Sequence, residues 1–245
     1  MNKMLKECQF TLKVISPLIL SPRSSEQFYV GIDYQSDEVD DVNIIYPFYR
    51  YGDYTEYKPE GIQYYIPGSS IKGALKSLIS VENNENWLVD DILVEKEDIV
   101  VRTMEKFQKT GSQDALKLNP FFQKIGVEML EEGRSYTGRL FCSENWLLKL
   151  EQVMQVGMRE RFVNNITRIN GLLKGADCEK LEGLRDRLEK LIEVESIIFL
   201  GGYKGLMHSL ENYSGKDEIE SGIYVARKME MEDFLIPGIV QLEFK

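Results

Sequence analysis

Residues 66–76, with the sequence IPGSSIKGALK, combine groups that proteins use to hold a phosphate. A proline and a glycine break the preceding segment, and Ser69 can cap a helix. The free N–H groups and the partial positive charge at a helix start favour an anion. Two lysines four residues apart add charge at the margin of the apolar face. The residues expected to contact the phosphate are Gly68, Ser69, Ser70, Lys72, Gly73 and Lys76.

The helix that positions these groups is expected to cover residues 69–80. Its apolar residues recur at the spacing of one helical face, which predicts that this face is buried. They are Ile71, Leu75, Leu78 and Ile79. An ordinary capped core helix with lysines facing water explains the same residues.

A second glycine-rich stretch, FLGGYKGL, occupies residues 199–206 near the C-terminus. We expect a buried strand over residues 196–200 to lead into it. Glycines let backbone amides approach a phosphate, a lysine adds charge, and a tyrosine offers a stacking surface. A tight turn explains the same glycines. The residues expected to contact a phosphate backbone are Gly201, Gly202, Tyr203, Lys204 and Gly205.

Residues 22–61 form a long aromatic and acidic segment. Its aromatic rings are interleaved with Arg50 and Lys58, a pattern that can stack nucleic-acid bases. The alternative is a loop or hairpin whose rings pack on the domain. The rings are Tyr46, Phe48, Tyr49, Tyr51, Tyr54 and Tyr57.

The string IPGSSIKGALK resembles the signature segment of the RAMP proteins (repeat-associated mysterious proteins), which build type III CRISPR effector complexes. Residues 199–206 resemble a variant of the glycine-rich loop of that family. Between them, residues 120–140, with GVEML and YTGRL, resemble the middle of the subunit that caps one end of the type III-A Csm complex. The resemblance implies contact with the guide RNA of the complex, the crRNA.

The charge balance limits how such a protein would bind RNA. Forty acidic residues against thirty basic ones give a formal net charge of −10, and phosphate neutralisation dominates RNA binding. The acidic residues gather in segments 37–41, 82–98 and 217–233, away from the two motifs. We therefore expect RNA contact to be shared with more basic neighbouring subunits.

The three cysteines, Cys8, Cys142 and Cys178, are scattered, and His208 is the single histidine. Neither a disulfide framework nor a zinc site follows from them, and we expect no cofactor. No apolar stretch is long enough for a signal peptide or a membrane span. We expect a soluble cytoplasmic protein with no membrane partner and no small-molecule substrate.

A catalytic role has weak support in the sequence. An endoribonuclease could use His208 as a general base, or Asp33, which falls where the backbone subunit of type III complexes carries its RNA-cleaving aspartate. The chain has no second histidine and no convincing metal cluster for acid–base chemistry. We therefore expect no catalytic residue.

The remaining elements follow from periodicity. Strands are expected over residues 9–15, 92–94, 99–101, 134–142 and 239–244. Helices over residues 144–169 and 177–194, with a break at 171–176, form a helical hairpin. Its leucine stripe is expected to pack in the core or at a subunit interface. Arg159, Arg161 and Arg168 are expected to contact either a phosphate backbone or surface carboxylates. The stripe consists of Leu181, Leu184, Leu188 and Leu191.

These elements predict an α+β fold with a ferredoxin-like (RRM-like) RAMP core. We expect one RAMP domain over residues 1–245, with an aromatic and acidic insertion near 22–61 and a helical hairpin insertion near 144–195. The expected function is that of a noncatalytic guide-RNA-binding and assembly subunit that caps a type III CRISPR ribonucleoprotein near the crRNA 3′ end. Its partners would be crRNA and other RAMP subunits. A RAMP endoribonuclease and a protein-only assembly piece are the alternatives.

Overall fold

The computed structural model describes most of the chain. The described residues are 5–22, 27–34, 42–52, 61–76, 87–109, 116–121, 123–174, 182–203, 223–228 and 233–245. Within this part, no helix combines the length and the apolar character that crossing a bilayer requires. His208, Lys204 and Gly205 lie outside the described residues, as does the acidic segment 37–41.

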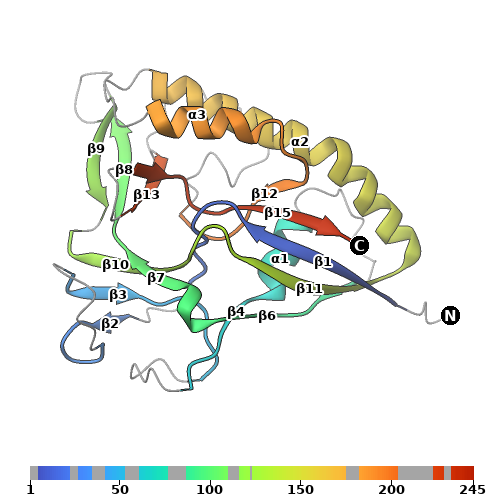
Figure 1. The fold of residues 1–245 in the computed structure, drawn as a ribbon, viewed down its shortest axis with the longest axis horizontal. Coiled ribbons are helices and arrows are strands. Elements are labelled where there is room, and N and C mark those ends of the chain that lie inside the picture. Colours follow the sequence, from blue (N-terminus) through green and yellow to red (C-terminus); the bar gives the residue numbers. More distant parts are fainter. Residues whose placement is uncertain are drawn as a thin grey trace.

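The main sheet is built around the first strand, β1 (Lys6–Val14). β1 pairs antiparallel with β11 (Ser135–Cys142) on one edge and with β15 (Ile239–Phe244) on the other. β12 (Ile197–Phe199) and β5 (Leu88–Val89) complete the order β12-β15-β1-β11-β5. In Figure 1 the blue strand β1 and the red strand β15 therefore lie side by side, and the N- and C-termini lie on the same side of the molecule.

Three α-helices cover the sheets. α1 (Gly68–Lys76) and the first part of α2 (Glu144–Lys174) contribute to the core cluster that contains β1, and Trp146 of α2 stacks on Trp87 with ring centroids 4.3 Å apart. The second part of α2 and α3 (Glu182–Leu191) share a second cluster with Ile197 of β12. Figure 1 shows α2 and α3 running together along one side of the molecule.

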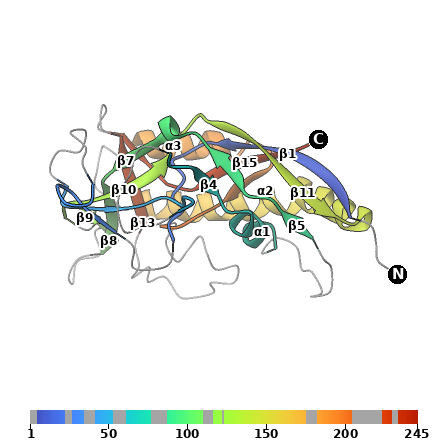
Figure 2. The same cartoon turned by 90° about the horizontal axis from the view of Figure 1, so that it is seen from below.

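Two further four-stranded sheets and a short ribbon extend the fold. One sheet has the order β2-β3-β10-β7, formed by β2 (Phe28–Tyr29), β3 (Ile44–Tyr46), β10 (Ile125–Leu130) and β7 (Ile99–Arg102). The other has the order β14-β13-β8-β9, formed by β14 (Asp233–Leu235), β13 (Ile223–Lys228), β8 (Met104–Lys109) and β9 (Leu116–Phe121). β4 (Tyr64–Ile66) pairs with β6 (Ile92–Val94), and a 3-10 helix, η1 (Lys96–Asp98), precedes β7. Figure 2 shows these sheets at the end of the molecule away from the chain termini.

Most predicted elements are confirmed, with some shifted ends. The strands predicted at 92–94 and 239–244 are β6 and β15, and the strand predicted at 9–15 is β1, which begins and ends earlier. The break predicted at 171–176 is misplaced, because α2 continues to Lys174. Segment 22–61 contributes β2 and β3 to a sheet, so part of the expected insertion is integrated into the fold. The chain is a mixed α/β protein in which sheet predominates.

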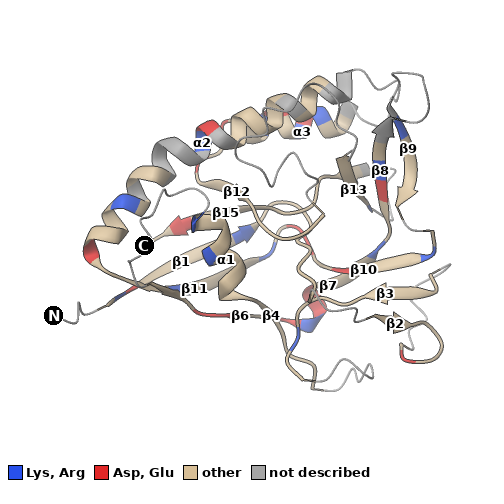
Figure 3. Ribbon diagram, turned by 180° about the vertical axis from the view of Figure 1, so that it is seen from behind, with Lys and Arg blue, Asp and Glu red and all other residues tan. Residues whose placement is uncertain are grey.

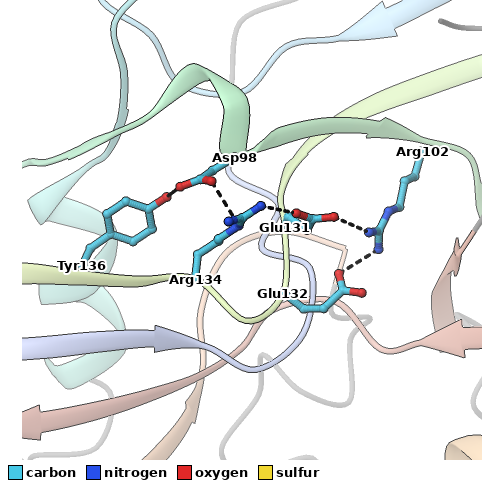
Figure 4. Close-up of polar contacts among 6 residues, drawn as sticks. All are labelled: Asp98, Arg102, Glu131, Glu132, Arg134 and Tyr136. Carbon is cyan, nitrogen blue, oxygen red and sulfur yellow. Dashed lines mark hydrogen bonds and ion pairs between the residues drawn. The ribbon is translucent and has the colours of Figure 1, made fainter.

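A network of charged residues holds the turn between β10 and β11. Figure 4 shows its members, Asp98, Arg102, Glu131, Glu132, Arg134 and Tyr136. The buried Arg102 lies 2.9 Å from the Glu132 carboxylate and 3.7 Å from that of Glu131. Arg134 bridges Glu131 and Asp98 at 2.7 and 3.0 Å. Every carboxylate of the network is paired with an arginine, which lies either on the same turn or on β7. We therefore assign the network a structural role.

Candidate functional site

α1 presents its predicted contact residues along its solvent-facing side. Ile71 and Leu75 are fully buried, as the apolar spacing predicted. Leu78 and Ile79 lie outside the described residues. Ser69, Gly73 and Lys76 are exposed, while Ser70 and Lys72 are half-buried.

The first amide of α1 is paired with a carboxylate. The Gly68 N–H donates to Asp91 Oδ1 at 2.7 Å, so a negative charge occupies the helix start, where the sequence predicted a phosphate. The helix begins at Gly68, which places Ser69 within the first turn. The expected Ser69 cap is therefore wrong, because Asp91, 23 residues further along the chain, supplies the capping oxygen.

The two glycines of α1 have different surroundings. A Cβ atom on Gly68 would lie 2.0 Å from the main-chain oxygen of Val89, so only glycine permits the close approach of α1 to the segment after β5. A Cβ atom on Gly73 would meet no described heavy atom within 4 Å. Gly73 therefore leaves an accessible patch of backbone on the exposed side of the helix.

The two lysines of α1 also differ. Lys72 Nζ donates to the main-chain oxygen of Trp87 at 2.6 Å and lies 5.0 Å from the centroid of the Trp87 ring. Lys76 is exposed and has no bonding partner within the described part of the chain. Lys72 thus holds α1 against the residue before β5, and Lys76 is the lysine whose charge faces solvent.

Two segments before α1, residues 49–51 and β4, form a three-stranded ribbon with one segment after it, β6. We call this ribbon the tyrosine ribbon. The Tyr51 N–H donates to Gln63 O and the Tyr65 N–H donates to Tyr49 O, both at 3.0 Å. On its outer face the Tyr51 and Tyr65 rings are stacked, with centroids 4.2 Å apart and planes 14° apart. The Tyr51 hydroxyl donates to Asp91 Oδ2 at 2.9 Å. Burial and this bond raise the pKa of Tyr51 to about 12.

The inner face of the tyrosine ribbon is buried, and it contacts a carboxyl group. Glu128 of β10 accepts a bond from the Phe48 N–H at 2.9 Å and one from the Tyr64 hydroxyl at 3.0 Å. Burial raises the pKa of Glu128 to about 7, against the opposing effects of these bonds and of Arg50. The aromatic segment therefore divides by strand alternation: Phe48 packs inside and Tyr51 faces outward. Tyr54, Tyr57 and Lys58 lie outside the described residues.

The described half of the glycine-rich loop packs inward. Gly201 has φ +89°, and a Cβ atom there would lie 2.3 Å from Ile19 O. The Gly202 N–H donates to the same Ile19 oxygen at 2.8 Å. The Tyr203 ring lies edge-on to Phe121, with centroids 5.6 Å apart, and burial raises its pKa. These glycines and this tyrosine therefore have structural contacts.

Of the two residues that a nuclease could use, the structure describes Asp33 but not His208. The carboxylate of Asp33 accepts a bond from the Tyr29 N–H at 3.0 Å and so closes the turn after β2. His208 lies outside the described residues. Within the described residues, no three His, Cys, Asp or Glu side chains are grouped so as to hold a metal ion.

The basic residues of the other described elements are interspersed with acidic ones along the chain. Figure 3, a ribbon coloured by residue type, marks the Lys and Arg positions and the Asp and Glu positions on these elements. On α2, Arg159 lies 3.4 Å from the Glu193 carboxylate, in line with the salt-bridged alternative, and the side chains of Arg161 and Arg168 are not described. The motifs therefore contribute isolated charges to the surface.

Three residues of this site were not predicted from the sequence. Asp91 and Trp87 bond to α1 across a long stretch of chain, and no local pattern indicates either contact. Tyr65 lies between two buried residues of β4, but the sequence from Gln63 to Ile66 does not alternate polar and apolar residues and so gave no signal for it.

No protein-family model and no curated protein sequence matches this chain. Solved structures do match. A chain from the cryo-EM structure of the Csm–crRNA–target RNA ternary complex of a type III-A CRISPR–Cas system is 14% identical, with a TM-score of 0.60 over 96% of this chain and 100% of that one. The crystal structure of Csm5 from T. onnurineus is 13% identical, with a TM-score of 0.52 over 94% of this chain and 99% of that one. The chain therefore has the fold of the Csm subunits of type III-A CRISPR–Cas complexes.

Proposed function

We propose that this chain is a noncatalytic guide-RNA-binding and assembly subunit of a type III CRISPR ribonucleoprotein, which caps the complex near the crRNA 3′ end in the cytoplasm. The observation that carries the proposal is the end-to-end match with Csm subunits, which covers at least 94% of this chain and 99% of each neighbour. Csm5 is one of these neighbours. The match supports the same interpretation as the signature segment at α1.

The strand order supports a ferredoxin-like core within this fold. Along the chain, β1, α1, β5, β11, α2 and β15 follow the order β-α-β-β-α-β. In the sheet the four strands lie in the order β15-β1-β11-β5, all antiparallel. We take the chain as one RAMP domain over 1–245, with the additions near 22–61 and 144–195 built around that core.

RNA contact is proposed for the exposed side of α1 and for the glycine-rich loop. At α1, Ser69, Gly73 and Lys76 face solvent and can reach a backbone phosphate beside the paired Gly68 amide. Ser70 and Lys72 border them. In the loop we propose contact for Lys204 and Gly205, which follow the inward-packed residues 201–203. The net charge of −10 favours sharing the crRNA with more basic RAMP subunits.

The test is guide-RNA retention by the complex reconstituted from this chain, crRNA and the neighbouring subunits, over a salt titration. Lys76→Gln removes one exposed charge and should reduce the slope of log affinity against log salt by about 1. The matched control is Lys6→Gln, an exposed lysine paired with Glu144, which should leave the slope unchanged. An unchanged slope for Lys76→Gln would remove α1 from the RNA contact.

A protein-only assembly piece is the second candidate, and one observation favours it. Asp91 already occupies the helix start and Lys72 is bonded to Trp87, so both parts of the expected phosphate site have partners in the chain. If this candidate is correct, the reconstituted complex should lose no guide RNA when Lys76 and Lys204 are replaced together by glutamine.

The endoribonuclease alternative is tested directly. The purified protein should leave RNA uncut, and His208→Ala and Asp33→Ala should not change RNA processing by the assembled complex. Metal-independent cleavage that disappears in His208→Ala, or metal-dependent cleavage that disappears in Asp33→Ala, would establish a nuclease instead.

A further inference from the structure

The outer face of the tyrosine ribbon combines aromatic rings with carboxylates. Strand alternation places seven side chains on it: Tyr49, Tyr51, Gln63, Tyr65, Asp91, Leu93 and Glu95. Tyr51 and Leu93, on the two strands that flank β4, are large side chains that are 47% and 53% exposed. None of these seven residues is a lysine or an arginine, and two are acidic. We call this surface the acidic tyrosine face.

The two stacked rings leave one ring face open. Tyr51 lies against Tyr65 on one side and is nearly half exposed. Its hydroxyl bonds to Asp91, which holds a carboxylate at the edge of the ring. Each oxygen of that carboxylate accepts one bond, from the Tyr51 hydroxyl or the Gly68 N–H, and keeps a lone pair for another donor.

Two kinds of ligand stack on tyrosine, nucleic-acid bases and guanidinium groups. A base would bring its phosphates close to Asp91 and Glu95, and no cation of this face offsets that repulsion. An arginine side chain would lay its planar guanidinium on the ring and donate to the adjacent carboxylate, so both of its contacts are favourable. Charge complementarity therefore separates the two ligands.

We propose that the acidic tyrosine face binds an arginine side chain from an extended basic segment of a partner protein. Tyr51 supplies the ring, Tyr65 supports it from behind, and Asp91 accepts the guanidinium N–H. Leu93, which is opposite Tyr65 in the β4–β6 register, provides apolar surface for the arginine stem. This surface adjoins the proposed RNA contact on α1, because Asp91 also accepts the Gly68 N–H, and it gives the negative charge of the chain a specific use in assembly.

The experiment uses the full-length chain with 3-fluorotyrosine incorporated and follows its ¹⁹F NMR signals. The probe is a short capped peptide with two arginines separated by glycine, compared with the same peptide carrying neutral citrulline in place of arginine. A single-stranded decauridylate is the RNA probe. We expect the arginine peptide to shift the Tyr51 and Tyr65 signals, with an affinity that falls as salt rises, and the other two probes to leave them unchanged.

Variants locate the effect. Tyr51→Leu should weaken binding of the arginine peptide about two- to fivefold, because an exposed cation–π contact of this kind is lost. Asp91→Asn keeps an oxygen for the Gly68 amide and removes the charge, so it should weaken binding by a similar factor. Tyr29→Leu is the matched control, since Tyr29 is 44% exposed on another sheet. It should change nothing.

Several results would overturn the proposal. Equal binding of the citrulline peptide would remove the charge argument. Shifts produced by decauridylate and not by the arginine peptide would make the face an RNA base-stacking surface. An arginine-peptide affinity unchanged in Tyr51→Leu, or no shift with either peptide, would show that this face is not an arginine receptor.

Discussion

The start of α1 and the loop after β12 contain similar residues but use them differently. Gly68 and Gly201 each allow one backbone to approach another, Val89 O in one case and Ile19 O in the other. On α1, Gly73 and Lys76 face solvent beyond that contact. In the loop, by contrast, Gly202 and Tyr203 pack against the rest of the protein. Glycine-rich stretches that look alike in sequence can thus differ in whether anything is left for a ligand.

The largest expected effect separates the two glycines of α1. Gly68→Ala places a Cβ atom 2.0 Å from a backbone oxygen, so the helix must shift, and we expect a loss of about 3 kcal/mol or more of unfolding free energy. Gly73→Ala, in open space within a helix, should raise stability by about 0.5–1 kcal/mol. Urea denaturation of both variants measures this difference. Equal midpoints would contradict the packing of α1 on β5.

The second effect concerns Glu128, which lies under the tyrosine ribbon that leads into α1. Its pKa in the folded chain, about 7, exceeds its ordinary value of 4.5, so the folded state binds more protons between these values. The stability from the protonated form is fully present below pH 4.5 and is lost as the pH rises through 7. From pH 5 to pH 8 we expect wild type to lose about 2–3 kcal/mol relative to Glu128→Gln.

Amide exchange locates this loss in the molecule. Protection of β4 and α1 should fall with rising pH, after correction for intrinsic exchange rates, while protection of β12 before the loop should not. A pH effect of the same size in Glu128→Gln would assign the titration to another group. A uniform loss across both regions would show that the two motifs are not supported separately.

The third effect tests the inward packing of the loop. Gly201→Ala forces a side chain onto a residue with φ +89° and onto the oxygen of Ile19, and should cost about 2 kcal/mol. Gly202→Ala is its control, because the nearest described atom to a Cβ there is 3.8 Å away. Thermal unfolding of the two variants is the measurement. A neutral Gly201→Ala would mean that the loop is free to face a ligand.

The smallest effect separates the two lysines of α1. Lys72→Gln removes the bond to the Trp87 carbonyl and should cost about 1 kcal/mol, whereas Lys76→Gln should stay within about 0.5 kcal/mol of wild type. Chemical denaturation of each single variant distinguishes them. Equal costs would show that both lysines face solvent, as in the alternative interpretation of the sequence as a capped core helix.

Local patterns predicted the elements whose residues carry their own signal. The apolar run at 239–244 is β15, and the spacing of Ile71 and Leu75 correctly predicted the buried face of α1. The hairpin of β8 and β9 was not predicted, because Pro120 interrupts its second strand. β9 is an edge strand in the order β14-β13-β8-β9, a position where a proline without an N–H is tolerated.

The site was less predictable than the fold because its decisive contacts are not local. Lys72 looks like any lysine at the margin of an amphipathic helix until Trp87 is placed beside it by the β5 connection. Asp91 reads as part of an acidic segment, yet it joins Gly68 to Tyr51. Sequence periodicity indicates which face of an element is buried but not which distant residue occupies its polar groups.

The central position of β1 has a consequence for the synthesis of the chain. β1 leaves the ribosome before its partner β11, which follows after more than a hundred residues. Its other edge stays uncovered until β15 has been made as well. At roughly 5–20 residues per second, the gap between β11 and β15 lasts about 5–20 s. During that interval the nascent chain exposes unpaired strand edges to other nascent chains, so prompt release and chaperone cover decide how much of the protein reaches its native sheet.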